Sequence, residues 1–205
     1  MIGKWNKSVI VTYVGMLLAV ASMILIMADK MSLAMMCFMV SGICDMFDGT
    51  VARMCKRTEE EKNFGIQLDS LADVIDFIAL PIVLVIKVCG VQWYSVVACA
   101  LYAVFGVARL AYFNVCQEEN EDKDSPIKYY TGLPVTFAAM IFSLAYLSIM
   151  WVDQVITGYI LCVAMVITAV LYVLKIKVIK PRKIGYIFFL ALAVVLFVLY
   201  IRLGK

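Results

Sequence analysis

The sequence has no histidine, only four prolines and few charges, since 16% of its 205 residues are Asp, Glu, Lys or Arg. Soluble domains carry about 25% charged residues and about 45–50% apolar ones. Here 65% of the residues are hydrophobic and the mean hydropathy is +0.98. The low charge excludes an ordinary soluble domain, the missing histidine argues against a zinc site, and no nucleic-acid partner is expected.

The seven cysteines do not form a metal-binding or redox motif, because no CxxC pair occurs. All except Cys55 lie in or near apolar runs, where cysteine behaves as a small polarisable hydrophobe. We interpret them as packing residues in a reducing environment.

Long apolar runs fill most of the chain and predict an all-α, polytopic transmembrane helix bundle. A helix needs about 20 apolar residues to cross the hydrocarbon of a bilayer. Seven runs have about that length, approximately 8–28, 31–53, 67–87, 91–116, 132–152, 154–174 and 184–202. We expect a single integral membrane domain, residues 1–205, with about six or seven spans. The first run is too long for a signal-peptide core, so it is predicted to be an uncleaved helix behind a short interfacial segment.

The basic residues are distributed unevenly between the two sides of this predicted bundle. Thirteen of the 18 Lys and Arg residues lie at the N-terminus and in or beside the loops 54–66, 117–131 and 175–183. Four lie on the opposite side, and Arg109 falls inside a run. By the positive-inside rule, the side with 13 faces the cytosol. The protein is therefore expected in the cytoplasmic (inner) membrane, with its N-terminus inside.

Five aspartates interrupt the apolar pattern between residues 41 and 77. Two groups follow helical spacing, so each shares one helix face. They are Asp45, Asp48, Gly49 and Ala52 at the end of the second run, and Gly65, Asp69, Asp73 and Asp76 around the start of the third. One short loop joins the two helices, so we expect antiparallel neighbours. Four or five carboxylates would then converge in an active site at the cytoplasmic end of spans two and three.

Such a cluster needs bound protons or cations, because two like charges about 4 Å apart repel by about 4 kcal/mol at an effective dielectric constant near 20. Oxygen ligands favour Mg²⁺ or Mn²⁺, and two metals that share carboxylates would clamp a phosphate for in-line displacement. The alternative is a solvated acidic surface, which suits residues 59–61 and 118–124. It suits Asp69 and Asp73 poorly, because aspartates inside apolar runs are costly and usually functional. For Asp76 both interpretations remain open.

Small residues beside the aspartates are compatible with nucleotide binding. Gly49 and Ala52 leave the helix face uncrowded, so that a flat nucleotide could approach the backbone. Arg53 could pair with a phosphate. Gly49 taken alone could equally be a helix-packing glycine.

The pattern D-x2-D-G-x2-A-R followed by G-x3-D-x3-D, here DMFDGTVAR and GIQLDSLAD, resembles the CDP-alcohol phosphatidyltransferases. These integral membrane enzymes join a CDP-activated lipid to an alcohol and release CMP. The resemblance covers about residues 5–145, within an expected catalytic core of 1–152, and residues 153–205 are expected to add C-terminal spans. Between Arg53 and Gly65 lie 11 residues, where the family commonly has about eight, which predicts a longer cytoplasmic turn.

The resemblance also implies roles for individual residues. Two divalent cations, Mg²⁺ or Mn²⁺, would be held by Asp45, Asp48, Asp69 and Asp73. Asp73 would also be the catalytic general base. The CDP-lipid would lie against Gly49, Ala52, Arg53 and Gly65. The family further implies a homodimer.

Two further stretches bear on the acceptor alcohol. RLAYFNV places Arg109 and Asn114 near the end of the fourth run, and YYTGLPVTFAA places Thr131 at the start of the fifth. Both, together with LDSLADVIDF, resemble the branch of the family that uses serine. An arginine inside a membrane needs a partner, and Arg109 could clamp the serine carboxylate, with Asn114 and Thr131 as weaker serine-binding candidates. Alternatively, Arg109 pairs with a structural aspartate such as Asp76, and the GLP segment simply starts a helix.

These features predict transfer of a phosphatidyl group from CDP-diacylglycerol to the hydroxyl of L-serine, giving phosphatidylserine and CMP. A sister transferase that uses glycerol 3-phosphate or inositol phosphate is the nearer alternative. Its dianionic acceptor would want several basic residues, and Arg109 is the only one inside a run. A divalent-cation transporter is the remoter alternative, because transport would favour carboxylates near the bilayer midplane.

Overall fold

The protein folds as a helical bundle with one very short β-ribbon. A computed structural model describes the backbone of residues 3, 6–120, 129–175, 177–179 and 183–204, and the side chains of these except 117–120, 129–131, 177–179 and 183–188. Within these residues the α-helices are α1 (Ile10–Met27), α2 (Met31–Met54), α3 (Glu59–Asp73), α4 (Leu80–Cys89), α5 (Trp93–Asn120), α6 (Phe137–Tyr146), α7 (Gln154–Val173) and α8 (Lys183–Leu203). Short 3₁₀ turns precede α1 at Lys7–Val9 and follow α6 at Leu147–Met150.

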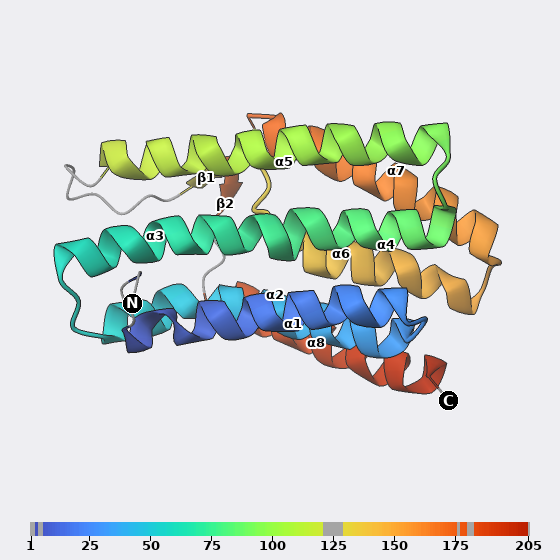
Figure 1. The fold of residues 1–205 in the computed structure, drawn as a ribbon, viewed down its shortest axis with the longest axis horizontal. Coiled ribbons are helices and arrows are strands. Elements are labelled where there is room, and N and C mark those ends of the chain that lie inside the picture. Colours follow the sequence, from blue (N-terminus) through green and yellow to red (C-terminus); the bar gives the residue numbers. More distant parts are fainter. Residues whose placement is uncertain (1–2, 4–5, 121–128, 176, 180–182, 205) are drawn as a thin grey trace.

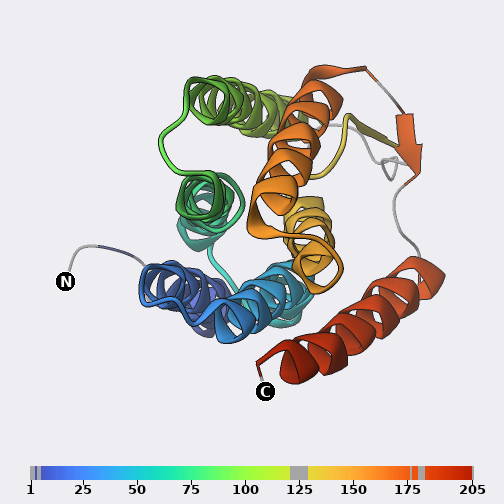
Figure 2. The same ribbon diagram turned by 90° about the vertical axis from the view of Figure 1, so that its right-hand side faces the viewer.

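The helices lie side by side, most of them along the longest axis of the molecule (Figure 1). The α1–α2 hairpin packs against α3 and α4, and α5 packs on the other side of them against α7. Seen from the end, α6 lies in the interior between α2 and α7, and α8 lies outermost beside α2 and α6 (Figure 2). Helices far apart in the sequence therefore meet at α4, which contacts α1, α5 and α7.

A single helical rod runs from Glu59 to Cys89, because a π-helical turn, Val74–Ala79, joins α3 to α4 without a break. Thr58 starts the rod with a capping box, in which its backbone N–H donates to Glu61 at 2.8 Å and its hydroxyl accepts from the Glu61 N–H. In the π-helical turn, the Phe77 carbonyl accepts a 2.6 Å hydrogen bond from the Tyr102 hydroxyl. Such turns recur at functional sites.

Among the described residues, four helices are long and apolar enough to cross a membrane: Lys7–Met27, Met31–Met54, Trp93–Cys116 and Gln154–Val173. The predicted all-α bundle is confirmed at this level, and four of the six or seven expected spans meet the criterion. The fifth predicted run gives a shorter apolar helix, Phe137–Met150, because its first residues form a loop. The third run is divided by the π-helical turn, and the seventh begins among side chains that are not described. Trp5, in the predicted interfacial segment, lies outside the described residues.

The β-ribbon was not expected from the sequence. Strands β1 (Tyr129–Thr131) and β2 (Lys177–Ile179) pair antiparallel, with Tyr130 opposite Val178. The ribbon ties the segment before α6 to the segment after α7. Three-residue strands carry too few residues for a period-two pattern to show.

Candidate active site

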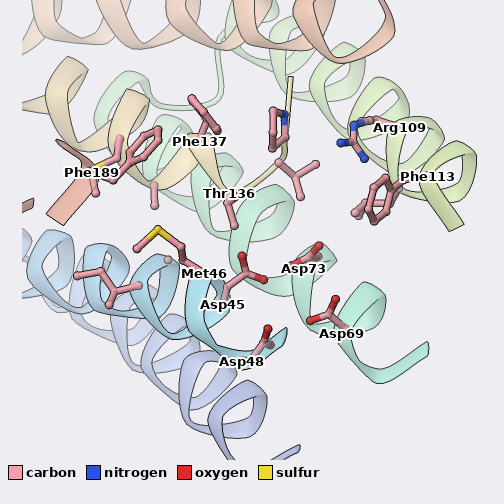
Figure 3. A pocket seen from close by; sticks show the side chains of 17 residues that line it. Asp45, Met46, Asp48, Asp69, Asp73, Arg109, Phe113, Thr136, Phe137 and Phe189 are labelled. Carbon is pink, nitrogen blue, oxygen red and sulfur yellow. The ribbon is translucent and has the colours of Figure 1, made fainter. Parts of the chain in front are cut away.

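The four motif aspartates meet where α2 and α3 face each other. Asp45 and Asp48 come from α2, and Asp69 and Asp73 come from α3, with their carboxylates turned toward one another (Figure 3). Oxygen atoms of Asp45, Asp48 and Asp69 lie within 4.8 Å of one another. Asp73 adjoins Asp45, and Asp48 adjoins Asp69. The structure thus brings together the four residues that the sequence proposed as ligands.

Local sequence explains this meeting. The four-residue link between α2 and α3 reverses the chain, and the Thr58 cap starts α3 at once. Spacings of three on α2 and four on α3 keep each aspartate pair on one helix face. The longer turn predicted between Arg53 and Gly65 is largely helix, because α3 already begins at Glu59.

Helix α1 supports the cluster from outside it. The Thr12 hydroxyl donates a 2.8 Å hydrogen bond to Oδ2 of Asp48, which is itself buried. This bond fixes the orientation of one carboxylate against its neighbours. Thr12 was missed in the sequence, because a lone threonine in an apolar run carries no signal of its own.

A cavity of about 260 Å³ opens beside the aspartates. Its lining comes from α2 and α3, from α5, from α6 and the segment that leads into it, and from α8. The polar and aromatic members of the lining are Asp45, Asp48, Asp69, Asp73, Arg109, Phe113, Thr136, Phe137 and Phe189. One side of the cavity is therefore acidic and the rest is apolar or basic, which suits a lipid that carries an anionic head group bound through cations.

Arg109 lies on the opposite wall from the aspartates (Figure 3). It is only 5% exposed, its Nε donates to the Leu133 carbonyl at 3.2 Å, and its guanidinium lies 4.9 Å from the centre of the Phe113 ring. A planar guanidinium held on a ring face presents its hydrogen-bond donors in a fixed plane. Arg109 is thus oriented by its surroundings and accessible from the cavity.

The segment between β1 and α6 contributes Pro134, Val135 and Thr136 to the cavity lining. Gly132 has φ +82°, and a Cβ placed there would come 2.8 Å from the Tyr172 carbonyl oxygen of α7. Only glycine meets both conditions at low cost. At Gly132 the GLP segment therefore passes close to the backbone of α7. Helix α6 does not start at this segment but later, at Phe137.

The proposed nucleotide-binding residues lie on α2 and α3 but are not part of the cavity lining; they are Gly49, Ala52, Arg53 and Gly65. A Cβ on Gly49 would meet no atom of the described residues within 4 Å, so Gly49 is not a tight helix-packing glycine. Arg53 is exposed and donates to the Thr50 hydroxyl at 3.2 Å.

Two of the serine-binding candidates are not placed in the cavity by the structure. Asn114 accepts a 3.0 Å hydrogen bond from Ser70 of α3, and it does not line the cavity. The side chain of Thr131 lies outside the described residues. Of the three candidates, Arg109 alone is seen to line the cavity.

Asp76 occupies the π-helical turn, one turn beyond Asp73. It is 3% exposed and accepts a 2.7 Å hydrogen bond on Oδ2 from Ser41 of α2. Its Oδ1 has no hydrogen-bond partner in the described part of the chain, and it does not line the cavity. The alternative in which Arg109 pairs with Asp76 therefore gains no support, since the hydrogen bond to the Asp76 carboxylate comes from Ser41.

The donor set fits divalent cations. Three carboxylate oxygens converge within 4.8 Å, a fourth carboxylate adjoins them, and Thr12 holds one of them from behind. All-oxygen sets of this kind suit hard cations, and hydrogen bonds behind the ligands are a common feature of metal sites. Unneutralised carboxylates at such distances would repel one another strongly in an apolar surrounding.

Comparison with known proteins gives the same family as the motif residues of this site. A family model described as CDP-alcohol phosphatidyltransferase matches residues 5–170. The chain is 34% identical over 113 residues to CDP-diacylglycerol--serine O-phosphatidyltransferase of Saccharomyces cerevisiae. The matched region covers 53% of this chain and 40% of the yeast protein. The chain is 33% identical over 124 residues to the Helicobacter pylori protein of the same name, covering 58% and 49%. It is 30% identical over 128 residues to archaetidylserine synthase of Methanothermobacter thermautotrophicus, covering 62% and 52%. The match thus spans about half the length of these relatives or less.

Proposed function

This chain belongs to the CDP-alcohol phosphatidyltransferase family, and on that premise we propose that it transfers a phosphatidyl group from CDP-diacylglycerol to L-serine, releasing CMP. The observation that carries the proposal is the convergence of the four motif aspartates on one cavity with the buried Arg109 on its opposite wall. The choice of serine is supported by relatives whose names state a serine acceptor, over about half of this chain.

In this proposal Asp45, Asp48, Asp69 and Asp73 hold two divalent cations, Mg²⁺ or Mn²⁺. When bound, the cations would neutralise the diphosphate of the lipid and the charge that develops on the departing CMP. The CDP moiety lies along the open face of α2 at Gly49 and Ala52, near Gly65, where the backbone can be approached closely. Arg53, exposed at the end of α2, is the phosphate contact.

The remaining chemistry falls to residues of the cavity. Asp73 accepts the proton of the serine hydroxyl, directly or through one water, as the oxygen attacks the lipid-side phosphorus in line. Arg109 binds the serine carboxylate, because its guanidinium is rigidly held and faces the cavity. Phe113, Phe137 and Phe189 give the cavity apolar walls that limit competing attack by water. No covalent enzyme intermediate is needed.

The proposal places the enzyme in the cytoplasmic membrane, with the aspartates near its cytosolic face and further spans formed by the α3–α4 rod, α6 and α8. The charge asymmetry of the sequence supports that orientation. The apolar side chains exposed along the membrane-spanning candidates, such as Leu17, Val104 and Val163, are appropriate for contact with lipid. A homodimer is proposed from the family alone.

An acceptor panel tests the proposal. Purified protein in detergent receives CDP-diacylglycerol, Mg²⁺ or Mn²⁺, and one labelled acceptor: serine, glycerol 3-phosphate, inositol, inositol phosphate or ethanolamine. We expect CMP release and a labelled lipid with serine. If transfer to a phosphorylated alcohol were as fast as transfer to serine or faster, the proposal that serine is the acceptor would be wrong. No CMP release with any acceptor, in protein that remains folded, would contradict the enzymatic assignment and leave cation transport as the function to test.

A further inference from the structure

Three thiols gather at the end of the bundle farthest from the aspartates. Cys89 is the last residue of α4, Cys99 lies in the second turn of α5, and Cys162 lies on α7. All three are free cysteines, and Cys99 is close enough to interact electrostatically with both of the others. Along the helical rod, Cys89 is about 24 Å from Asp73 at about 1.5 Å per residue, so the thiols take no part in the proposed transfer.

Cys89 and Cys162 are nearly within bonding reach. Their Sγ atoms are 3.6 Å apart, on two helices that pack directly against each other. A disulfide has an S–S distance of about 2.05 Å, so the two sulfur atoms need to approach by about 1.5 Å to form the bond. Cys89 is half-buried and Cys162 is buried, so a small oxidant can reach the pair through Cys89.

Gly158 makes this approach possible. The Cys89 thiol lies against the Gly158 backbone, with Sγ 3.2 Å from the carbonyl oxygen to which it donates. A Cβ at position 158 would come 3.0 Å from that Sγ. The α4–α7 contact is further fixed by Gln154, whose side-chain amide donates to the Val88 carbonyl at 3.3 Å. The Gln154 contact and the packing of α4 on α7 hold the two cysteines in register whatever the oxidation state of the thiols, whereas the hydrogen bond from Cys89 to Gly158 exists only while Cys89 carries its S–H.

We propose that Cys89 and Cys162 form a reversible disulfide that links α4 to α7 when the protein meets a thiol oxidant. With diamide as the oxidant, one thiolate adds to the N=N bond, and the second thiolate then attacks the first sulfur and releases the hydrazine. Two S–H bonds are lost, one S–S bond forms, and the two electrons and two protons end on diamide. The disulfide would anchor the α4 end of the helical rod to α7. The α3 half of the same rod carries Asp69 and Asp73.

The test maps the bond directly. The full chain in detergent is treated with diamide, its remaining thiols are alkylated, and the peptides are analysed by mass spectrometry without reduction. We expect one dominant linked pair, Cys89 with Cys162, that disappears on dithiothreitol treatment. Four other thiols should stay reduced during the diamide treatment and therefore be found alkylated, and they serve as internal controls: Cys37, Cys44, Cys55 and Cys116. In the denatured chain the pairing should become unselective.

Two variants complete the test. Cys99→Ser should leave the linked pair unchanged, whereas Cys162→Ser should abolish it, with melting temperatures of both reduced proteins near that of the parent. A dominant Cys99–Cys162 pair would contradict the proposal. So would seven alkylated thiols in the folded, oxidant-treated parent, or linkage that is no more selective in the folded protein than in the denatured one.

Discussion

Asp73 and Asp76 lie one turn apart on the same rod, yet their surroundings assign them different tasks. Asp73 lines the cavity, whereas Asp76 lies outside the cavity lining and accepts a hydrogen bond from Ser41. Asp73→Asn should lower the rate of CMP release by about 10²–10⁴-fold, because it removes the general base. Asp76→Asn keeps an acceptor for the Ser41 hydroxyl and should stay within about tenfold, a barrier change of about 1.4 kcal/mol. Both rates are measured as serine-dependent CMP release. The assignment of the base is wrong if the two variants are equally impaired.

Thr12 provides a test of support from outside the carboxylate cluster. Thr12→Val keeps the shape of the side chain and removes the 2.8 Å hydrogen bond to Asp48. The concentration of Mn²⁺ that gives half-maximal activity should rise by about 10–100-fold, as is typical when a hydrogen bond to a ligand is lost. Thr168→Val is the matched control, because among the described residues the Thr168 hydroxyl donates its hydrogen bond within its own helix, to the Ala164 carbonyl at 2.7 Å. An unchanged Mn²⁺ requirement in Thr12→Val would show that Asp48 does not depend on this bond.

Arg109 provides a test of acceptor recognition. Arg109→Lys keeps the positive charge but loses the planar fork that can bind a carboxylate through two nitrogens. The apparent KM for serine should rise by about tenfold or more, since hydrogen bonds to charged groups contribute about 1.5–3 kcal/mol. The KM for CDP-diacylglycerol should change little, and the parent should use ethanolamine poorly because it has no carboxylate. If the variant weakens only CDP-diacylglycerol, Arg109 binds the diphosphate and the serine assignment loses its physical basis.

At the scale of elements, the link between β1 and α6 supplies part of the cavity wall through Pro134, Val135 and Thr136. Gly132 combines a left-handed backbone with close contact to the Tyr172 carbonyl, and the residues that follow it line the cavity. Gly132→Ala should lower the melting temperature and also the rate of CMP release, because the clash must displace either this segment or α7. The strain of the left-handed conformation alone costs about 1–2 kcal/mol.

Gly90 supplies the control for that strain. It also has a positive φ of +70°, but a Cβ there meets no atom of the described residues within 4 Å, and it lies at the far end of the rod. Gly90→Ala should therefore lower the melting temperature with the catalytic rate nearly unchanged. Equal effects of the two substitutions on the rate would mean that Gly132 acts through general stability and not through the cavity.

At the scale of the whole molecule, the sequence predicted the parts whose signal is local. The D-x2-D and D-x3-D spacings lie within single helices, so helical periodicity places Asp45 with Asp48 and Asp69 with Asp73 on one face of each helix. The short loop between the two helices predicted that these faces meet. The resemblance drawn from those positions is confirmed by the family match over residues 5–170. Helix existence in long apolar runs was equally predictable, because length and composition decide it.

The features that were missed depend on contacts between distant segments. Thr12 is 36 residues from Asp48, and Ser41 is 35 residues from Asp76. Cys89 and Cys162, interpreted as packing residues, are 73 residues apart and meet only because α4 and α7 pack together. The β1–β2 ribbon joins segments separated by two helices. Neither spacing nor composition records such pairings, so they become visible only in the folded bundle.

The central claim is that the aspartate cluster is a metal-dependent site for phosphatidyl transfer, and the most direct measurement is serine-dependent CMP release in the parent and in Asp45→Asn, Asp48→Asn and Asp69→Asn. Each substitution keeps the side-chain volume and removes one charged ligand of the cluster. The account predicts that chelation of divalent cations abolishes CMP release in the parent and that Mn²⁺ restores it. It also predicts that all three variants remain folded, with at least 10²-fold (about 2.7 kcal/mol) lower rates at saturating Mn²⁺. Near-parental rates in any two of the variants, or undiminished activity of the parent after chelation, would contradict it.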